Sequence, residues 1–318
     1  MATAARIYGV LLSETMDLKS YYALDFGVDA PDVCLLNPDE VTHPEEIRFA
    51  ACWLPGPDAF VPYPNLEMAM SVGAGVDALL NHAGLNDNVA ICRVRDPKQA
   101  DLMAGYAVHE VVHFEREFTQ MQRNQLAATW APLPIGAPSD LNVTVLGNGS
   151  MGAAIVRALA AVGFSVFVAC RRSPHDPIDG VTYFTGDSSV TGAVAEANVV
   201  INTLPLTAHT ENVLNADLFN RLAPGAWLVQ IGRGEHLVED DLIAALESGQ
   251  LAGATLDVFR QEPLPVDHAF WRDDRLRITP HIASDTMPHI VAAQVLQSAR
   301  ELLSGAPLSL SVNVAQGY

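Results

Sequence analysis

The stretch "VTVLGNGSMGAAIVRALA", residues 143–160, contains the pattern G-x-G-x-x-G at Gly147, Gly149 and Gly152. An apolar run precedes this pattern and a helical run follows it, which is the context of a dinucleotide-binding turn. The glycines would permit a tight turn, a close backbone approach to a pyrophosphate, and close packing of the helix on the strand. The first N–H groups of the helix, at Ser150 and Met151, would then face the phosphates. A glycine-rich turn that binds no ligand is the alternative interpretation.

Around this turn, apolar runs of strand length alternate with helical patterns. The predicted strands cover 141–147, 165–170, 199–205, 226–232, 253–259 and 276–282. The predicted helices cover 150–163, 190–197, 215–223 and 238–249. Continuous apolar strands of this kind are typical of a parallel sheet with helices on both faces. The sequence therefore predicts a doubly wound α/β domain.

The rest of the chain carries a second α/β pattern. Short apolar runs at 6–13, 33–37, 49–55, 67–75 and 89–94 predict the strands of a smaller layer. A long helix is predicted over 100–126, followed by a proline-rich linker at 130–140. A final helix, over about 286–304, is expected to return to the first layer.

Composition limits the classes of function. The 318 residues, 49% of them hydrophobic, suffice for one large or two medium domains. A net charge of −19 argues against binding nucleic acid or an anionic membrane through a basic surface. The four cysteines form no C-x-x-C pair, and no apolar run reaches membrane-spanning length. The apolar run near the N-terminus is too short for a secretion signal, so we expect a cytoplasmic protein.

The end of the strand at 165–170 bears on the choice of cofactor. An NAD site usually places an acidic residue here to hold the ribose diol. This chain instead has Cys170, followed by Arg171 and Arg172. Two guanidinium groups can hold a 2′-phosphate, whereas a carboxylate would repel it. The sequence favours NADP(H), with NAD(H) possible; a solvated arginine pair is the alternative interpretation.

Polar residues of catalytic type follow three of the predicted strands, at Arg233, at Asp257 and Glu262, and at His281. Reduction of a 2-keto acid by hydride needs a cation for the carboxylate, which the fork of Arg233 can supply while polarising the keto oxygen. It also needs a proton donor near neutral pH, which suits His281. A carboxylate beside the ring, for which Glu262 is the candidate, would favour the imidazolium. Each residue alone could be structural, but together they predict a catalytic set.

The stretch "HEVVH", residues 109–113, matches the zinc-binding pattern H-E-x-x-H. The longer form of that pattern fails because Arg116 and Thr119 occupy its later positions. On a helix, the apolar stripe would be Met103, Tyr106, Ala107, Val111, Phe114, Phe118 and Met121, beside a polar stripe of His109, His113, Arg116 and Gln120. Glu110 would lie on the packing side, where a local hydrogen bond or a subunit contact suits it better than activating water. We expect no metal here.

Motifs along nearly the whole chain resemble those of the D-isomer-specific 2-hydroxyacid dehydrogenases, and within that family the enzymes that reduce glyoxylate and hydroxypyruvate. They are "SVGAGVD" (71–77), "YAVHEVVHFEREF" (106–118), "LGNGSMG" (146–152), "TLPLTAHTENVLN" (203–215), "GRGEHLVEDDLIAALESGQLAGATLDVF" (232–259), "EPLP" (262–265), "ITPHIAS" (278–284) and the closing "GY" (317–318). The resemblance implies two Rossmann-like domains. The coenzyme domain, 107–286, would be inserted into a smaller flavodoxin-like substrate domain of 1–106 and 287–318. It also implies a homodimer.

The resemblance assigns residues to roles. Arg233, Glu262 and His281 match the family's catalytic residues, and the N–H groups of Ala74 and Gly75 would hold the substrate carboxylate. Trp53 would lie near a substrate-facing loop, with a plain core tryptophan as the alternative. The cofactor cleft would be lined by Leu204, Pro205, Thr210, Ile231, Asp257 and His281. Which of the two arginines, Arg171 or Arg172, meets the 2′-phosphate is left open.

The sequence is therefore compatible with two functions. The first is an NAD(P)H-dependent reductase that converts small 2-keto acids of the glyoxylate and hydroxypyruvate type to D-2-hydroxy acids. The second is a non-catalytic, cofactor-sensing binding protein on the same fold. The complete Arg–Glu–His set favours the reductase.

Overall fold

The structure, a computed structural model, describes residues 6–314. It divides into two compact units, one made of Gln99–Ser284 and the other of the chain before and after that segment. The units change over at 98/99 and 284/285, whereas the sequence places the domain boundaries at 106/107 and 286/287. The extreme N-terminal residues and the closing "GY" motif lie outside the described residues.

The unit formed by the two chain ends is built on a parallel sheet. Its strands are β1 (Ile7–Leu12), β2 (Val33–Leu36), β3 (Ile47–Cys52), β4 (Met68–Ser71) and β5 (Ala90–Arg93). They are ordered β2-β1-β3-β4-β5, and all four neighbouring pairs are parallel. This is the flavodoxin-like order, so the fold predicted for this part of the chain is confirmed.

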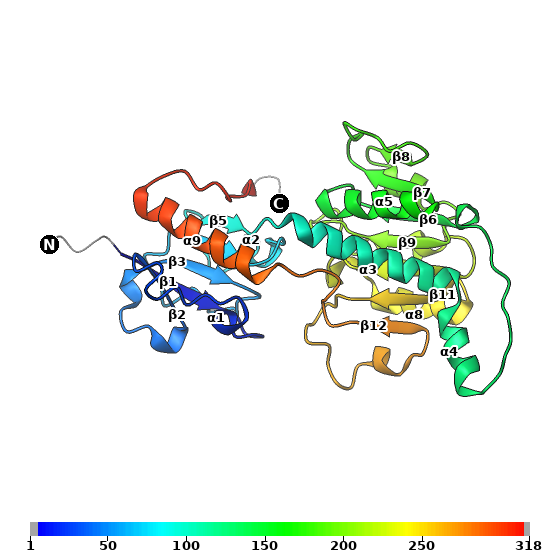
Figure 1. The fold of residues 1–318 in the computed structure, drawn as a ribbon, viewed down its shortest axis with the longest axis horizontal. Coiled ribbons are helices and arrows are strands. Elements are labelled where there is room, and N and C mark those ends of the chain that lie inside the picture. Colours follow the sequence, from blue (N-terminus) through cyan, green and yellow to red (C-terminus); the bar gives the residue numbers. More distant parts are fainter. Residues whose placement is uncertain (1–5, 315–318) are drawn as a thin grey trace. The chain divides into compact units, whose positions relative to one another are not determined.

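Helices cover both faces of this sheet (Figure 1). Helices α1 (Leu18–Tyr21) and α9 (Pro288–Ser304) pack on one face, where Leu18, Val291 and Val295 are buried against the strands. Helix α2 (Asp77–Leu80) and the loop before β4 cover the other face through Leu79 and Phe60. The final helix therefore belongs to the first unit, as the sequence predicts.

The unit Gln99–Ser284 contains a seven-stranded parallel sheet. Its strands are β6 (Asn142–Leu146), β7 (Ser165–Cys170), β8 (Thr182–Thr185), β9 (Val199–Asn202), β10 (Ala226–Gln230), β11 (Leu251–Leu256) and β12 (Leu276–Ile278). The order β12-β11-β10-β9-β6-β7-β8 is the doubly wound dinucleotide-binding order with one strand added at an edge. Strand β8 was not predicted, because none of its four residues is fully buried and "TYFT" carries little apolar signal.

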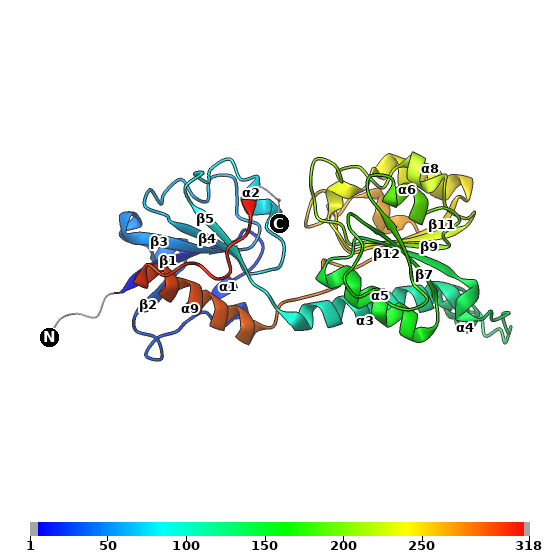
Figure 2. The ribbon, with the colours of Figure 1, turned by 90° about the horizontal axis from the view of Figure 1, so that it is seen from above.

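Each face of this sheet carries its own helices, as Figure 2 shows. Helices α3 (Pro97–Glu115) and α5 (Ser150–Val162) pack on one face; α6 (Ser189–Ala193), α7 (Ala216–Phe219) and α8 (Glu239–Ser248) pack on the other. The central strands β9 and β10 are buried along their whole length, which explains their continuous apolar sequence. Short 3-10 turns occur at Pro38–Glu40, Pro44–Glu46, Pro138–Asp140, Gly234–His236 and Ala269–Arg272.

The single helix predicted over 100–126 is wrong. Helix α3 ends at Glu115, and a separate helix, α4 (Phe118–Leu126), follows it. The break lies at Glu117, whose φ of 49° is left-handed and cannot continue a right-handed helix. As a result the predicted apolar stripe stops short: no residue of α4 is buried, and Phe118 is 39% exposed. Within residues 6–314 no helix is long and apolar enough to span a bilayer.

Candidate active site

The glycine pattern forms the turn between β6 and α5. Gly147 has a φ of 101°, which favours glycine. A Cβ on Gly152 would lie 2.1 Å from the carbonyl oxygen of Gly147, so helix and turn can approach only if position 152 has no side chain. A Cβ on Gly149 would meet nothing within 4 Å. Space next to Gly149 is therefore left open, as a phosphate-binding turn requires.

The start of α5 presents hydrogen-bond donors without a cap. Gly149 is the N-cap of this 13-residue helix and makes no side-chain cap hydrogen bond, and Ser150 is exposed there. Met151 is partly buried. A helix start of this kind attracts anions. The donor chemistry of this turn therefore fits the pyrophosphate of a dinucleotide.

Two exposed arginines follow the neighbouring strand. Strand β7 pairs with β6 in parallel, so its end at Cys170 lies at the same edge of the sheet as the glycine turn. Arg171 and Arg172 come next and are both exposed. The strand end thus offers cations where an NAD site would have a carboxylate, which fits a 2′-phosphate.

The loop after β9 is closed by its own hydrogen bonds. Thr210 donates from its hydroxyl to the carbonyl oxygen of Pro205 over 2.6 Å and accepts from the N–H of Thr207 over 2.9 Å. Leu204 packs partly against the core, and Ile231, at the end of β10, is buried. These are the residues that the family resemblance assigns to the cofactor cleft.

His281 and Glu262 form a pair. The Nδ1 of His281 lies 2.7 Å from Oε2 of Glu262, and each side chain is about three-quarters buried. The other carboxylate oxygen of Glu262 accepts from the N–H of Phe259 over 2.9 Å. Burial alone would raise the pKa of Glu262, but the hydrogen bond from His281, the charge of His281 and that of Arg233 outweigh burial and lower it. Glu262 is therefore ionised at neutral pH and holds the ring in place.

The backbone at His281 is held in an unusual conformation. Its φ is 55°, in the left-handed region that side chains rarely adopt. The N–H of His281 donates to the carbonyl oxygen of Asp257 over 2.8 Å, and the Asp257 carboxylate accepts from the N–H groups of Ile282 and Ala283, each over 2.8 Å. Asp257 is only 1% exposed. The predicted strand over 276–282 thus ends at Ile278, and a turn organised by Asp257 presents His281.

Arg233 is positioned through its backbone by three buried polar residues that the sequence analysis missed. Its N–H donates to Nδ1 of His236 over 3.0 Å, and its carbonyl oxygen accepts from the Gln230 side chain over 2.7 Å. Asn202 donates to both Gln230 and His236, and all three are fully buried. Since Nδ1 of His236 accepts two N–H groups, Nε2 carries the ring hydrogen. For Asn202 and Gln230 the sequence held a signal, because each is a polar residue at the end of an otherwise apolar strand.

The glycine after Arg233 brings two strand ends together. A Cβ on Gly234 would lie 1.9 Å from the carbonyl carbon of Phe259, so only glycine permits this approach. Phe259 in turn donates to Glu262. The "GRG" sequence therefore sets Arg233 close to the segment that carries the His281–Glu262 pair, and the charge of Arg233 acts on Glu262.

The residues assigned to the substrate lie in the other unit, Trp53 just after β3 and Ala74 and Gly75 after β4. Trp53 packs over the backbone of Gly73, where a Cβ would lie 2.9 Å from the indole ring. Among residues 6–314, no acceptor takes the N–H groups of Ala74 and Gly75. Arg93, missed in the sequence, donates from Nη1 to the carbonyl oxygen of Ala74 over 3.2 Å. The loop therefore offers the N–H groups of Ala74 and Gly75 as donors, and the Arg93 side chain holds the loop through the carbonyl oxygen of Ala74.

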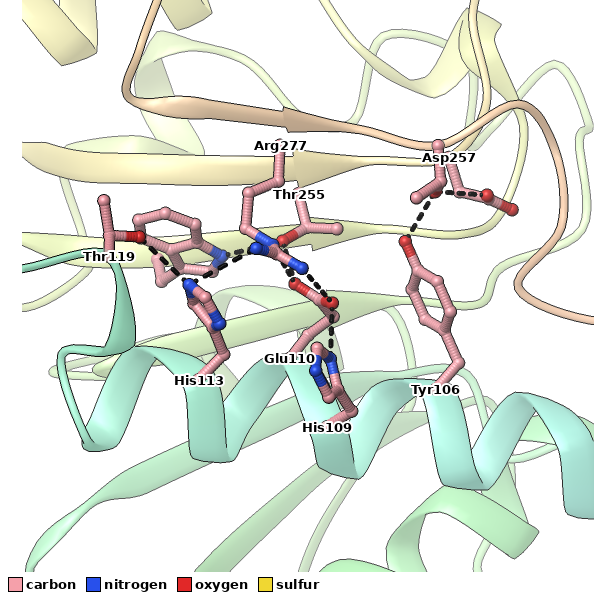
Figure 3. A network of polar contacts seen from close by, with 10 residues as sticks. Tyr106, His109, Glu110, His113, Thr119, Thr255, Asp257 and Arg277 are labelled. Carbon is pink, nitrogen blue, oxygen red and sulfur yellow. Dashed lines mark hydrogen bonds and ion pairs between the residues drawn. The ribbon is translucent and has the colours of Figure 1, made fainter. Parts of the chain in front are cut away.

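The "HEVVH" segment belongs to a buried network, shown in Figure 3. Glu110 is 2% exposed and accepts from Thr255 over 2.6 Å and from Nε of Arg277 over 3.0 Å. His109 lies 2.8 Å from the same carboxylate. These contacts tie α3 to strands β11 and β12. The local hydrogen bond expected for Glu110 is present, and the carboxylate is engaged by a cation rather than left to activate water.

The sequence places His113 on a polar stripe beside the buried face of the helix, but in the structure His113 is itself buried. Its Nε2 faces both the hydroxyl of Thr119, at 3.0 Å, and Nη1 of Arg277, at 3.4 Å. Burial, together with the positive charge of Arg277, lowers the pKa of His113. The part of the chain that the structure describes holds no group of three His, Cys, Asp or Glu side chains arranged to bind a metal.

Comparison with known proteins identifies the family. Residues 108–283 match the family described as D-isomer specific 2-hydroxyacid dehydrogenase, NAD binding domain. The glyoxylate/hydroxypyruvate reductase A of Serratia proteamaculans is 39% identical over 276 residues, covering 85% of this chain and 87% of that protein. The corresponding protein of Yersinia enterocolitica is 36% identical over the same shares.

Solved structures agree. A D-isomer specific 2-hydroxyacid dehydrogenase from Xanthobacter autotrophicus, in complex with NADPH and MES, superposes with a TM-score of 0.86 at 33% identity, covering 99% of this chain and 100% of that one. An NADPH-dependent glyoxylate/hydroxypyruvate reductase from Sinorhizobium meliloti, in complex with NADP and sulfate, gives a TM-score of 0.88 at 28% identity, covering 98% and 100%. This chain belongs to the D-isomer specific 2-hydroxyacid dehydrogenase family, as its motifs predict.

Proposed function

We propose that this protein is an NADP(H)-preferring reductase that converts small 2-keto acids of the glyoxylate and hydroxypyruvate type to D-2-hydroxy acids. The observation that carries the proposal is the His281–Glu262 pair, 2.7 Å apart, next to Arg233 on a dinucleotide-type sheet. Relatives that are 36–39% identical bear the name glyoxylate/hydroxypyruvate reductase A, which supports the substrate class.

In this proposal the unit Gln99–Ser284 binds the cofactor. The glycine turn and the start of α5 hold the pyrophosphate, and one or both of Arg171 and Arg172 hold the 2′-phosphate. The remaining cofactor contacts come from Leu204, Pro205, Thr210, Ile231, Asp257 and His281. NAD(H) lacks the 2′-phosphate, so we expect it to bind more weakly. The unit made of the chain ends binds substrate through the N–H groups of Ala74 and Gly75, with Trp53 beside the loop.

The chain's own residues divide the remaining work. Bound NADPH supplies the hydride. The guanidinium of Arg233 holds the substrate carboxylate and polarises the keto oxygen, on which negative charge develops as the carbon is reduced. Because Nδ1 of His281 donates to Glu262, Nε2 is the nitrogen that hands a proton to that oxygen. After this transfer the imidazole of His281, still paired with the ionised Glu262, regains a proton from solvent.

Steady-state kinetics tests this proposal. The wild type is expected to oxidise NADPH in the presence of glyoxylate or hydroxypyruvate, with a higher kcat/KM than with NADH. Arg233→Ala and His281→Ala should each lower kcat/KM by about a thousandfold or more, since each removes a group that acts in the transition state. Circular dichroism and NADPH fluorescence would establish that both variants fold and bind cofactor.

The same measurements separate the reductase from a cofactor sensor. NADPH binding by the wild type without turnover of any 2-keto acid in a broad panel would favour the sensor. Near-wild-type rates in either variant would refute the mechanism, and a preference for NADH would refute the cofactor assignment.

We further propose that the protein is a cytoplasmic homodimer. All four cysteines, Cys34, Cys52, Cys92 and Cys170, are free thiols, which suits a reducing compartment. The family resemblance implies dimerisation through the coenzyme domain. Support comes from large apolar side chains that stand exposed on α4 and just after it, Phe118, Leu126, Trp130 and Ile135.

A further inference from the structure

A chain of hydroxyl hydrogen bonds runs from helix α3 to the turn that carries His281. The hydroxyl of Thr279 donates to Oδ1 of Asp257 over 2.6 Å, and the hydroxyl of Tyr106 lies 2.7 Å from the Thr279 oxygen. Thr279 has one hydroxyl hydrogen, which it gives to the carboxylate, so it must accept from Tyr106. Burial raises the pKa of Tyr106, which keeps that donor protonated. Figure 3 shows Tyr106 reaching up from α3 toward the strand end at Asp257.

The carboxylate at the end of this chain organises the backbone around His281. Oδ1 of Asp257 accepts from Thr279 and from the N–H of Ile282, and Oδ2 accepts from the N–H of Ala283. These donors flank His281, whose own N–H is bound by the carbonyl oxygen of Asp257. A left-handed φ is strained for a residue other than glycine and persists only where surrounding contacts impose it. The contacts that impose it here converge on one buried carboxylate.

We propose that Tyr106 and Thr279 are positioning residues for His281: together they fix the Asp257 carboxylate, and through it the left-handed turn that presents the imidazole to substrate. The proposal rests on the proposed function, in which His281 is the proton donor. Neither hydroxyl touches the reacting atoms. Thr279 acts at the carboxylate, and Tyr106 acts one hydrogen bond further away, from a helix more than 170 positions earlier in the sequence.

The arrangement predicts a graded effect of removing each hydroxyl. Without the Thr279 hydroxyl, the Asp257 carboxylate keeps the N–H groups of Ile282 and Ala283 but loses one of its three donors, so it is held less firmly. A displacement of about 1 Å in a catalytic group can cost as much as a hundredfold in rate. Without the Tyr106 hydroxyl, Thr279 still donates to Asp257 but loses the group that orients it. Loss at Thr279 should therefore exceed loss at Tyr106.

The test compares Thr279→Val, Thr279→Ser and Tyr106→Phe with the wild type. We expect Thr279→Val to lower kcat by about tenfold or more and Tyr106→Phe by about threefold, because hydride and proton transfer depend on geometry. Thr279→Ser keeps the hydroxyl and should retain at least half the wild-type kcat. In the cofactor-free protein, amide hydrogen exchange of Ile282 and Ala283 should be faster in Thr279→Val and near normal in Thr279→Ser.

Thr144→Val is the matched control. Its hydroxyl is buried and donates from β6 of the same sheet to the carbonyl oxygen of Ala193, the last residue of helix α6, over 2.6 Å, far along the chain from the turn. It should lose a comparable amount of stability with no change in kcat or in exchange at Ile282 and Ala283. An equal loss of kcat in this control would overturn the proposal.

Two further outcomes count against the proposal. One is wild-type kcat and wild-type exchange in Thr279→Val and Tyr106→Phe; if Thr279→Val does not fold, Tyr106→Phe and Thr279→Ser decide. The other is failure of Thr279→Ser to restore activity. Failure of the proposed function would look different, since the wild type itself would then not reduce 2-keto acids, while the exchange measurements would still report on the turn.

Discussion

At the scale of single residues, the glycines of one motif serve different ends. Gly152 is required by the fold, because a Cβ there would lie 2.1 Å from the Gly147 carbonyl oxygen. Gly149 is not, because a Cβ there would meet no protein atom within 4 Å, and its φ of −72° suits any residue. Packing within the protein therefore does not account for the glycine at position 149. A bound pyrophosphate is the physical reason that the proposed function offers.

The surroundings of Gly149 and Gly152 predict that an added methyl group weakens cofactor binding at position 149 and lowers stability at position 152. Gly149→Ala should change the free energy of unfolding by less than about 1 kcal/mol, the scale of an N-cap substitution. It should nevertheless raise the Kd for NADPH by about tenfold or more, equivalent to ~1.4 kcal/mol. Gly152→Ala should lower the free energy of unfolding by about 1–3 kcal/mol or more, as overpacking does.

Urea titration of the cofactor-free protein and NADPH fluorescence titration would measure the two quantities separately. Unchanged NADPH affinity in a folded Gly149→Ala variant would argue against cofactor binding at this turn.

At the scale of elements, α3 is anchored to the sheet by charge as well as by apolar packing. Glu110 pairs with Arg277 on β12, the edge strand, and bonds to Thr255 on β11. Hydrogen bonds from Thr255 and Arg277 lower the pKa of Glu110 despite its burial, which on its own would raise it. The neighbouring His113 is held neutral, since burial and Arg277 lower its pKa from 6.5. The segment that matches a zinc-binding pattern therefore anchors α3 to strands β11 and β12.

Both groups make the protein less stable in acid, in two windows. A pKa that is lower in the folded chain than in the unfolded chain means that the unfolded chain binds more protons, so stability falls as pH falls. For His113 the loss begins as the pH drops through about 6.5, the ordinary value, and for Glu110 as it drops through about 4.5. Each loss continues until the pH reaches the lowered pKa of the folded state.

We expect His113→Gln to flatten the fall in stability between pH 7 and pH 5. A single proton contributes at most about 1.4 kcal/mol per pH unit to that slope. Urea denaturation at fixed pH values would measure the slope, and His209→Gln, which changes an exposed histidine on the loop after β9, is the control. Equal slopes in wild type and His113→Gln would show that His113 does not carry this pH dependence.

At the scale of the whole molecule, the segment after α3 is hard to explain in an isolated chain. Leu126 is 90% exposed and Trp130 is 98% exposed, although both are large and apolar. Figure 1 shows α4 and the following loop running outside the strands and helices of their unit. Apolar side chains gathered in one segment usually mark an interface. A second copy of this chain is the partner that the family resemblance suggests.

The proposed homodimer predicts a definite change in mass. Light scattering coupled to gel filtration should give the wild type twice the mass of one chain. The double variant Leu126→Ser, Trp130→Ser should give a single-chain mass or a concentration-dependent mixture, because the interface loses its apolar contacts. Val28→Ser, which changes an equally exposed apolar residue in the other unit, should leave the mass unchanged. A single-chain mass for the wild type would refute the homodimer.

Much of the fold was predictable because local patterns sufficed for it. Continuous apolar strands, a glycine turn between strand and helix, and regular alternation specified both sheets, and the predicted fold class and family are confirmed. The errors lie where local pattern and tertiary environment disagree. Glu117 breaks a helix that its periodicity would continue, and β8 lacks an apolar signal because no residue of it is fully buried. The roles of Arg233, Glu262 and His281 remain predictions that kinetics must test.

By itself, the sequence determined which chemistry-bearing residues follow which strands, because parallel strands bring their carboxyl ends to one edge whatever the details of packing. Only the tertiary structure decided how those residues are held. Asn202, Gln230 and His236 look like ordinary strand or turn residues until burial forces them to pair around the Arg233 backbone. Tyr106 and Thr279 reveal their connection to His281 only when a helix and a strand end, distant in sequence, meet. Hydrogen-bond partners depend on distance in space, and a local pattern records distance only along the chain.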